Sequence, residues 1–122
     1  MITNHRKTHV VFPGDCNSMG TIFGGKILCE FDLVAFEHSI LLLQNSLCND
    51  AVTVGIKEVS FLYGPREGEM LEFHSVVKKI GIKSLTFDLI CVTIEGKEVA
   101  KGEITFVCRQ NGQTYPHGLE RL

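Results

Sequence analysis

The sequence has almost no excess of either charge. Its 122 residues carry twelve basic and fourteen acidic side chains, which gives a net charge of −2. Domains that bind nucleic acid carry clustered positive charge, and helices that bind anionic membranes are also basic. The composition argues against both classes, so we expect neither nucleic acid nor a membrane as a partner.

Long uncharged apolar segments and a secretory signal are also missing. No run is long enough to span a bilayer, and no apolar segment follows the basic residues near the start. Hydrophobic residues make up 44% of the chain, which is enough for a packed core and too much for a disordered protein. The length predicts a single domain over residues 1–122.

Paired cysteines and histidines with the spacing of metal ligands are absent as well. The five cysteines are scattered, and no two form a Cys-x-x-Cys pair. This argues against a disulfide framework and against a zinc site. We therefore expect a reducing, cytoplasmic compartment, with no metal and no other cofactor. Cys91 and Cys108 alternate with apolar strand residues and are expected to lie in the core.

What is present is one long segment typical of a helix among several alternating segments typical of strands. Residues 24–44 lack proline and predict a helix of about 31 Å. Strands are predicted at 7–12, 52–63, 70–80, 83–94 and 98–109, with a β-bulge near Lys57–Glu58 where the alternation changes phase. Tight turns require antiparallel pairing. The predicted fold class is α+β, with one helix on one antiparallel sheet.

The predicted helix places Asp32 about 120° from a stripe expected to face solvent, which consists of Lys26, Glu30, Leu33, Glu37 and Gln44. Within this stripe Lys26 and Glu30 are expected to form an ion pair. Asp32 instead faces an apolar layer or a cleft, where an unpaired carboxylate costs several kcal/mol. It is either a functional group or a residue held by a loop, by an exposed end of the sheet or by a partner lysine.

The segment before the helix is rich in turn-forming residues, among them Gly20, Gly24 and Gly25. Glycines at a helix entrance let another group approach the free backbone N–H donors, which carry the positive end of the helix dipole. Such a site suits an anion or a developing oxyanion. Tight packing of the helix on the sheet is the structural alternative.

The run PGDCNSMGTIFGGKILCEFD resembles the hotdog-fold acyl-CoA thioesterases, in particular the broad-specificity bacterial acyl-CoA hydrolases. The elements that match their pattern are Pro13, Asp15, Asn17, Gly20, Phe23, Gly24, Gly25 and Asp32. Further matches are VTV at 52–54, GxxS from Gly81 to Ser84, and TFV followed by Asn-Gly. The resemblance implies a hotdog fold, in which a five-stranded antiparallel sheet wraps around one long central helix.

The resemblance also implies a function, the hydrolysis of acyl-CoA thioesters to a free acid and coenzyme A. Asp32 corresponds to the general base or nucleophile. Gly24 or its neighbour Gly25 supplies the N–H that polarises the thioester carbonyl. Asn17 positions that carbonyl, and Thr53 orients the attacking water.

Other residues are expected to contact the substrate. Coenzyme A carries phosphates that require cations, and the candidates surround the turn at Gly81: Lys78, Lys79, Lys83 and, beside them, Ser84. A solvated hairpin would carry the same lysines. Phe23 and Phe36 are candidates for the substrate pocket, although Phe36 could equally belong to the core.

The spacing along the helix predicts a dimer. Gly24 and Asp32 are eight residues apart, about 12 Å along the axis, whereas an oxyanion donor and a general base must each lie about 3 Å from their targets. We therefore expect Asn17 and Gly24 from one subunit to meet Asp32 and Thr53 from its partner. The resemblance agrees, because hotdog proteins form dimers that often assemble into tetramers or hexamers.

Two other functions stay open. A hotdog module that binds or senses acyl-CoA without turnover has no need of a carboxylate beside the thioester, and such bacterial regulators usually add a helix-turn-helix for which this chain has no room. A hotdog dehydratase or hydratase relies on a histidine near the pocket, and no histidine lies between His9 and His38.

Overall fold

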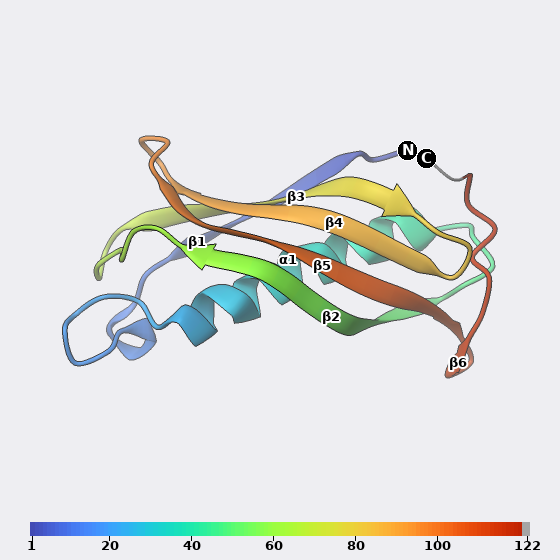
Figure 1. The fold of residues 1–122 in the computed structure, drawn as a ribbon, viewed down its shortest axis with the longest axis horizontal. Helices are drawn as coiled ribbons and strands as arrows, with labels where there is room; N and C mark the ends of the chain where they lie inside the picture. Colours follow the sequence, from blue (N-terminus) through green and yellow to red (C-terminus); the bar gives the residue numbers. More distant parts are fainter. Residues whose placement is uncertain (121–122) are drawn as a thin grey trace.

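A computed structural model describes residues 1–120 of the chain, in which one long helix lies against one antiparallel sheet (Figure 1). The elements in chain order are β1 (Asn4–Val10), the 3-10 turn η1 (Pro13–Asp15), α1 (Gly24–Leu43), β2 (Asp50–Phe61), β3 (Met70–Ile80), β4 (Ser84–Thr93), β5 (Glu98–Gln110) and β6 (Gln113–Thr114).

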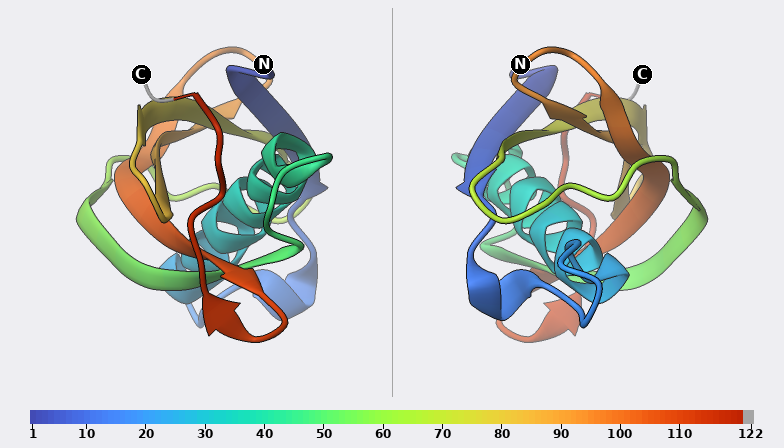
Figure 2. Two further views of the ribbon diagram at one scale, coloured as in Figure 1. Left: turned by 90° about the vertical axis from the view of Figure 1, so that its right-hand side faces the viewer. Right: turned by 90° about the vertical axis from the view of Figure 1, so that its left-hand side faces the viewer.

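The strands follow the order β1-β3-β4-β5-β2, and β6 pairs with the end of β5. Every strand pair is antiparallel. Seen end-on, the sheet curves around α1, and the edge strands β1 and β2 flank the helix (Figure 2). The predicted α+β architecture is therefore confirmed.

Most predicted boundaries agree with the structure to within two residues, but two elements differ. β1 begins at Asn4 rather than at residue 7 and ends at Val10, because its polar first half pairs with β3 from Asn4↔Val76 onward. β6 was not predicted. The Asn111-Gly112 pair forms the tight hairpin turn between β5 and β6, because both residues have positive φ values, 51° and 81°.

The predicted β-bulge in β2 is confirmed. The register against β5 shifts between Lys57 and Ser60, and Glu58 has a φ of 56°, which a residue with a side chain adopts at some cost. A second shift lies between Thr53 and Gly55. Both irregularities lie in an edge strand of the sheet.

The core fills the space between α1 and the concave face of the sheet. Phe31 of the helix contacts Phe73 edge-on, with ring centroids 5.6 Å apart, and both are fully buried. Cys91 and Cys108 are buried as predicted, and burial raises the pKa of each thiol to about 12. This packing fixes the position of α1 over the sheet and its rotation about its own axis. It thereby also fixes the direction in which the Asp32 side chain points.

The prediction that Glu30 faces solvent is wrong, since it is only 2% exposed. The predicted ion pair with Lys26 is present at 3.5 Å, but Lys7 from β1 also lies 2.8 Å from the Glu30 carboxylate. The edge strand therefore covers this part of the helix with polar side chains.

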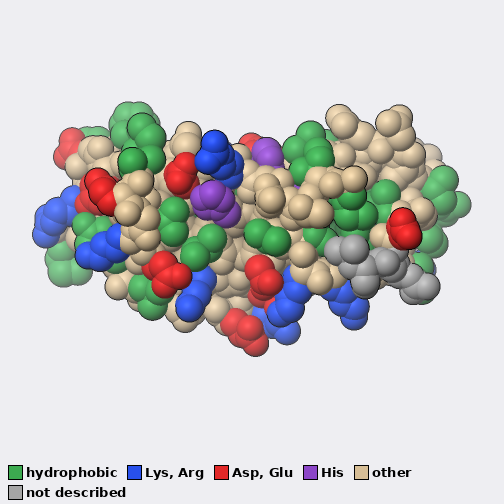
Figure 3. All heavy atoms as spheres, turned by 90° about the horizontal axis from the view of Figure 1, so that it is seen from above, with side chains coloured by type: hydrophobic (Ala, Val, Ile, Leu, Met, Phe, Trp, Pro, Cys, Tyr) green, Lys and Arg blue, Asp and Glu red, His purple; other side chains and the backbone are tan. Residues whose placement is uncertain are grey.

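On the face seen from above, acidic and basic side chains are interspersed, with apolar groups between them (Figure 3). Within residues 1–120, no helix has the length and apolar character needed to cross a membrane.

Candidate active site

Asp32 projects from the third turn of α1 toward the edge strand β2. The Thr53 hydroxyl donates a hydrogen bond to Oδ1 of Asp32 at 2.5 Å, and both residues are exposed to solvent in the single chain. A carboxylate can accept hydrogen bonds at both oxygens. One oxygen of Asp32 is thus held in place, and the other can accept a hydrogen bond from a water molecule or approach a substrate carbonyl.

Asp32 and Thr53 share a cleft with the start of the helix. The cleft has a volume of about 280 Å³ and is lined by Gly25, Leu28, Cys29, Asp32, Thr53, Ile56 and Ile104. Apart from the Asp32–Thr53 pair, most of its lining is apolar. The volume is at the small end for a ligand site, since pockets for small molecules usually measure about 300–1,000 Å³.

The two glycines at the start of α1 have different surroundings. The N-cap Phe23 has extended backbone and provides no side-chain cap, so the helix offers no acceptor for the N–H groups of Gly24 and Gly25. A Cβ at Gly24 would lie 3.3 Å from the Phe61 ring, whereas one at Gly25 would meet nothing within 4 Å. Gly24 is therefore packed closely against Phe61, whereas Gly25 has open space at its Cβ position.

Asn17 organises the loop that precedes the helix. Its Oδ1 accepts hydrogen bonds from the backbone N–H groups of Met19 and Thr21 at 3.0 and 3.1 Å, and its Nδ2 donates to the Thr21 hydroxyl at 3.0 Å. An amide nitrogen has two donors, so one N–H of Asn17 stays available for a ligand.

No protein-family model and no curated protein matches the sequence significantly. Solved structures do match. A Staphylococcus aureus acyl-CoA hydrolase in complex with butyryl coenzyme A, coenzyme A and coenzyme A disulfide has a TM-score of 0.78 at 23% identity, over 93% of this chain and 68% of that one. A hexameric acyl-CoA thioesterase without ligand has a TM-score of 0.80 at 27% identity, over 93% and 74%. A Streptococcus mutans protein bound to acetyl-CoA has a TM-score of 0.77 at 20% identity, over 91% and 85%.

The chain has the hotdog fold. The β3–β4 turn, which contains Lys83, lies at the opposite end of the molecule from the start of α1 (Figure 1). Lys78 contacts Glu103, and this contact raises the pKa of Lys78 and lowers the pKa of Glu103. Lys78 and Lys79 line a cleft of about 440 Å³ that also contains Glu103.

The GxxS motif has a structural explanation in this turn. The Gly81 N–H donates to the carbonyl of Ser84 at 3.0 Å, and a Cβ at Gly81 would clash with the Ser84 hydroxyl unless that side chain rotated. Lys83 is exposed beside it. The turn therefore favours glycine at position 81 whether or not Lys83 and Ser84 contact a ligand.

The two predicted aromatic contacts lie on the surface of the single chain. Phe23 is 52% exposed, and Phe36 is 38% exposed, so Phe36 does not belong to the core. Phe36 lies one turn beyond Asp32 and lines a shallow apolar groove together with Ile40 and Leu41. Its ring centroid is 6.5 Å from that of Phe106.

Sequence reasoning gave no role to Asp15, which the structure connects to both ends of the loop. Its carboxylate accepts the Phe12 N–H at 3.0 Å, and its carbonyl accepts the Phe23 N–H at 2.8 Å. Hydrogen bonds from Phe12 and His9, together with the charges of His9 and Lys26, outweigh the effect of desolvation and lower the pKa of Asp15. The aspartate of the sequence motif was the only signal for this position.

Proposed function

We propose that this protein is an acyl-CoA thioesterase, which hydrolyses acyl-CoA to a free acid and coenzyme A. The observation that carries the proposal is the Asp32 carboxylate, held by Thr53 in a mostly apolar cleft beside the helix. A positioned base and preorganised N–H donors are the two groups that hydrolysis of an acyl compound needs. The thiol of coenzyme A is a good leaving group, so a strong general acid is not required.

The comparisons support the assignment of Asp32 and Asn17. Two similar solved structures, with TM-scores of 0.82 and 0.84 at 22% identity, are mutants of the S. aureus acyl-CoA hydrolase in which an aspartate and an asparagine are replaced by alanine. Those two residues are fifteen positions apart in that enzyme. Asn17 and Asp32 have the same separation in this chain.

The proposed mechanism begins with the thioester carbonyl bound to the N–H groups of Gly24 or Gly25, with Asn17 beside it. Asp32 then either takes a proton from a water molecule that attacks the carbonyl carbon, or attacks that carbon itself to form an anhydride, which water hydrolyses. In both routes the C–S bond breaks and coenzyme A leaves as the thiolate. Thr53 holds one carboxylate oxygen in both routes. The acyl group lies against Phe36, and Phe23 contacts the substrate near the start of the helix.

The site is completed by a second subunit in this proposal. Gly24 and Asp32 are separated by about 12 Å along the helix axis, so one thioester cannot contact both groups of the same chain. Two of the similar solved structures are hexameric acyl-CoA thioesterases. Asn17 and Gly24 of one subunit are paired with Asp32 and Thr53 of the other. In this proposal Lys78, Lys79, Lys83 and Ser84 contact the phosphates of coenzyme A.

The test is a thiol-release assay with acyl-CoAs of graded chain length, on the wild type, Asp32→Asn and Asp32→Ala. The wild type should release coenzyme A, and Asp32→Asn should lower kcat by at least about 100-fold, the usual contribution of a general base. Tight binding of acyl-CoA without thiol release by the wild type would identify a binding or sensing module instead. Full activity of Asp32→Asn would refute the assignment of the carboxylate.

A further inference from the structure

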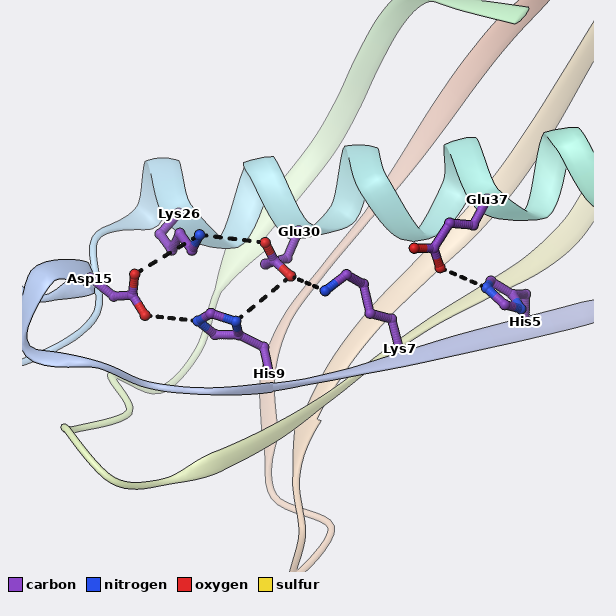
Figure 4. A network of polar contacts seen from close by, with 7 residues as sticks. All are labelled: His5, Lys7, His9, Asp15, Lys26, Glu30 and Glu37. Carbon is purple, nitrogen blue, oxygen red and sulfur yellow. Dashed lines mark hydrogen bonds and ion pairs between the residues drawn. The ribbon is translucent and has the colours of Figure 1, made fainter. Parts of the chain in front are cut away.

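A network of charged side chains joins β1, η1 and the start of α1, and the proposed mechanism does not use it. Figure 4 shows its five members meeting between the helix and the edge strand: Lys7, His9, Asp15, Lys26 and Glu30. The side chains of His9 and Asp15 are each 13% exposed, and that of Glu30 is 3% exposed. The two lysines are more exposed, at 27% and 31%, so the carboxylates and the histidine form the shielded part of the network.

His9 lies between two carboxylates. Its Nε2 is 2.7 Å from Oδ2 of Asp15, and its Nδ1 is 3.8 Å from Oε1 of Glu30. Glu30 is further paired with Lys7 at 2.8 Å and Lys26 at 3.5 Å. Carboxylates thus alternate with histidine and lysine side chains from the edge strand through the loop to the helix.

Asp15 converts this network into a constraint on the loop. Through its side chain it binds His9 of β1 and the Phe12 N–H, and through its carbonyl it binds the N–H of Phe23, the N-cap of α1. The direction of the free N–H groups of Gly24 and Gly25 follows from the position of that cap. Asp15 therefore connects the edge strand to the first turn of the helix.

Stability alone gives a weak reason for such a network. Removing paired charges from water costs about as much as their attraction returns, and well-packed apolar residues often stabilise a fold as well or better. Geometry gives a stronger reason, because donors to an oxyanion act only when they are already oriented. A displacement of about 1 Å can lower the rate roughly 100-fold.

We propose that His9 and Asp15 are positioning residues of the site, which clamp the loop at residues 13–23 against β1 so that the N–H groups of Gly24 and Gly25 are held toward the thioester carbonyl. This inference rests on the proposed function. Neither residue touches the reacting atoms, and both act through the first turn of the helix.

Two variants test the clamp, and a third is the matched control. His9→Gln removes the imidazole between the carboxylates, and Asp15→Asn removes the charge while leaving an acceptor for the Phe12 N–H. His74→Gln removes another histidine near a carboxylate, Glu72 at 3.8 Å, from the neighbouring strand β3. We expect His9→Gln and Asp15→Asn to lower kcat about 10- to 100-fold with KM changed less than about threefold, and His74→Gln to change neither.

Hydrogen exchange provides a readout that does not depend on turnover. His9→Gln and Asp15→Asn should accelerate amide exchange in residues 13–25 and leave exchange in β3, β4 and β5 unchanged. If the wild type releases no thiol, the proposed function fails, while the accelerated exchange still reports the clamp. Unchanged exchange in this segment, or accelerated exchange with wild-type kcat in an active enzyme, would overturn the positioning role.

Discussion

The hydrogen bond between Thr53 and Asp32 makes a quantitative prediction about catalysis. Thr53→Val keeps the branched shape of the side chain and removes only the hydroxyl that donates to Oδ1 of Asp32 at 2.5 Å. A methyl group cannot approach a carboxylate oxygen that closely. The carboxylate therefore loses a donor and also has to move, so its free oxygen no longer points at a fixed position.

The expected magnitude follows from the type of hydrogen bond and its exposure. Hydrogen bonds to charged groups contribute about 1.5–3 kcal/mol. Because both residues are exposed in the single chain, solvent screening favours the lower end of this range, about 1.5 kcal/mol. One factor of ten in rate corresponds to about 1.36 kcal/mol. Thr53→Val should therefore lower kcat about tenfold.

The assay is thiol release at saturating acyl-CoA, with Thr53→Ser as the matched control because serine retains the hydroxyl. Thr53→Ser should keep at least about a third of the wild-type kcat. Thermal unfolding of both variants checks that the fold is intact. A wild-type kcat in Thr53→Val, or an equal loss in the valine and serine variants, would refute a role for the hydroxyl.

Two further predictions concern the pH dependence of the stability of the fold and the open space beside Gly25 at the start of α1. Burial lowers the pKa of His38, whose Nε2 lies 2.8 Å from the Ile2 carbonyl, so the unfolded chain binds a proton at this position before the folded protein does. The free energy of unfolding should therefore fall as pH decreases below about 6.5. Urea titrations from pH 8 to 5 should show that this free energy declines less steeply with falling pH in His38→Gln than in the wild type. Equal declines in the two proteins would contradict this. Gly25→Ala should retain the wild-type melting temperature, because nothing lies within 4 Å of the new Cβ. It should nevertheless lower kcat about tenfold, because the methyl group crowds the N–H donor. An unchanged kcat would show that Gly25 faces no substrate.

The sequence predicted the elements well, because α1 and the apolar strands follow clear periodicities. It failed where polar residues face inward. On β1 the partly buried side chains are those of His5, Lys7 and His9, which alternate with exposed neighbours. A reading based on hydrophobicity places such residues, and Glu30 opposite them, in solvent. Only the structure, in which β1 lies beside α1, shows that the polar face of the helix and the polar face of the strand cover each other.

The candidate site was predicted from a motif rather than from periodicity. Helical angles placed Asp32 away from the polar stripe, but they could not show that Thr53 of β2 lies 2.5 Å from it. That contact depends on the position of β2 at the end of the strand order and on its register against β5. The role of Asp15 was equally inaccessible, because its partners are His9 of β1, Phe12 just before η1, and Phe23, the N-cap of α1.

The two sides of α1 differ in charge and in exposed apolar surface. On the β1 side, paired charges fill the space between strand and helix. On the β2 side, Asp32 and Thr53 are exposed, and the edge strand presents Val52, Val54 and Ile56 at exposures of 37%, 57% and 38%. Apolar side chains on an unpaired strand edge are costly to leave in water. We therefore expect a second subunit to pack against β2, where it would cover these side chains. The start of its own helix would then lie next to Asp32 and complete the proposed site.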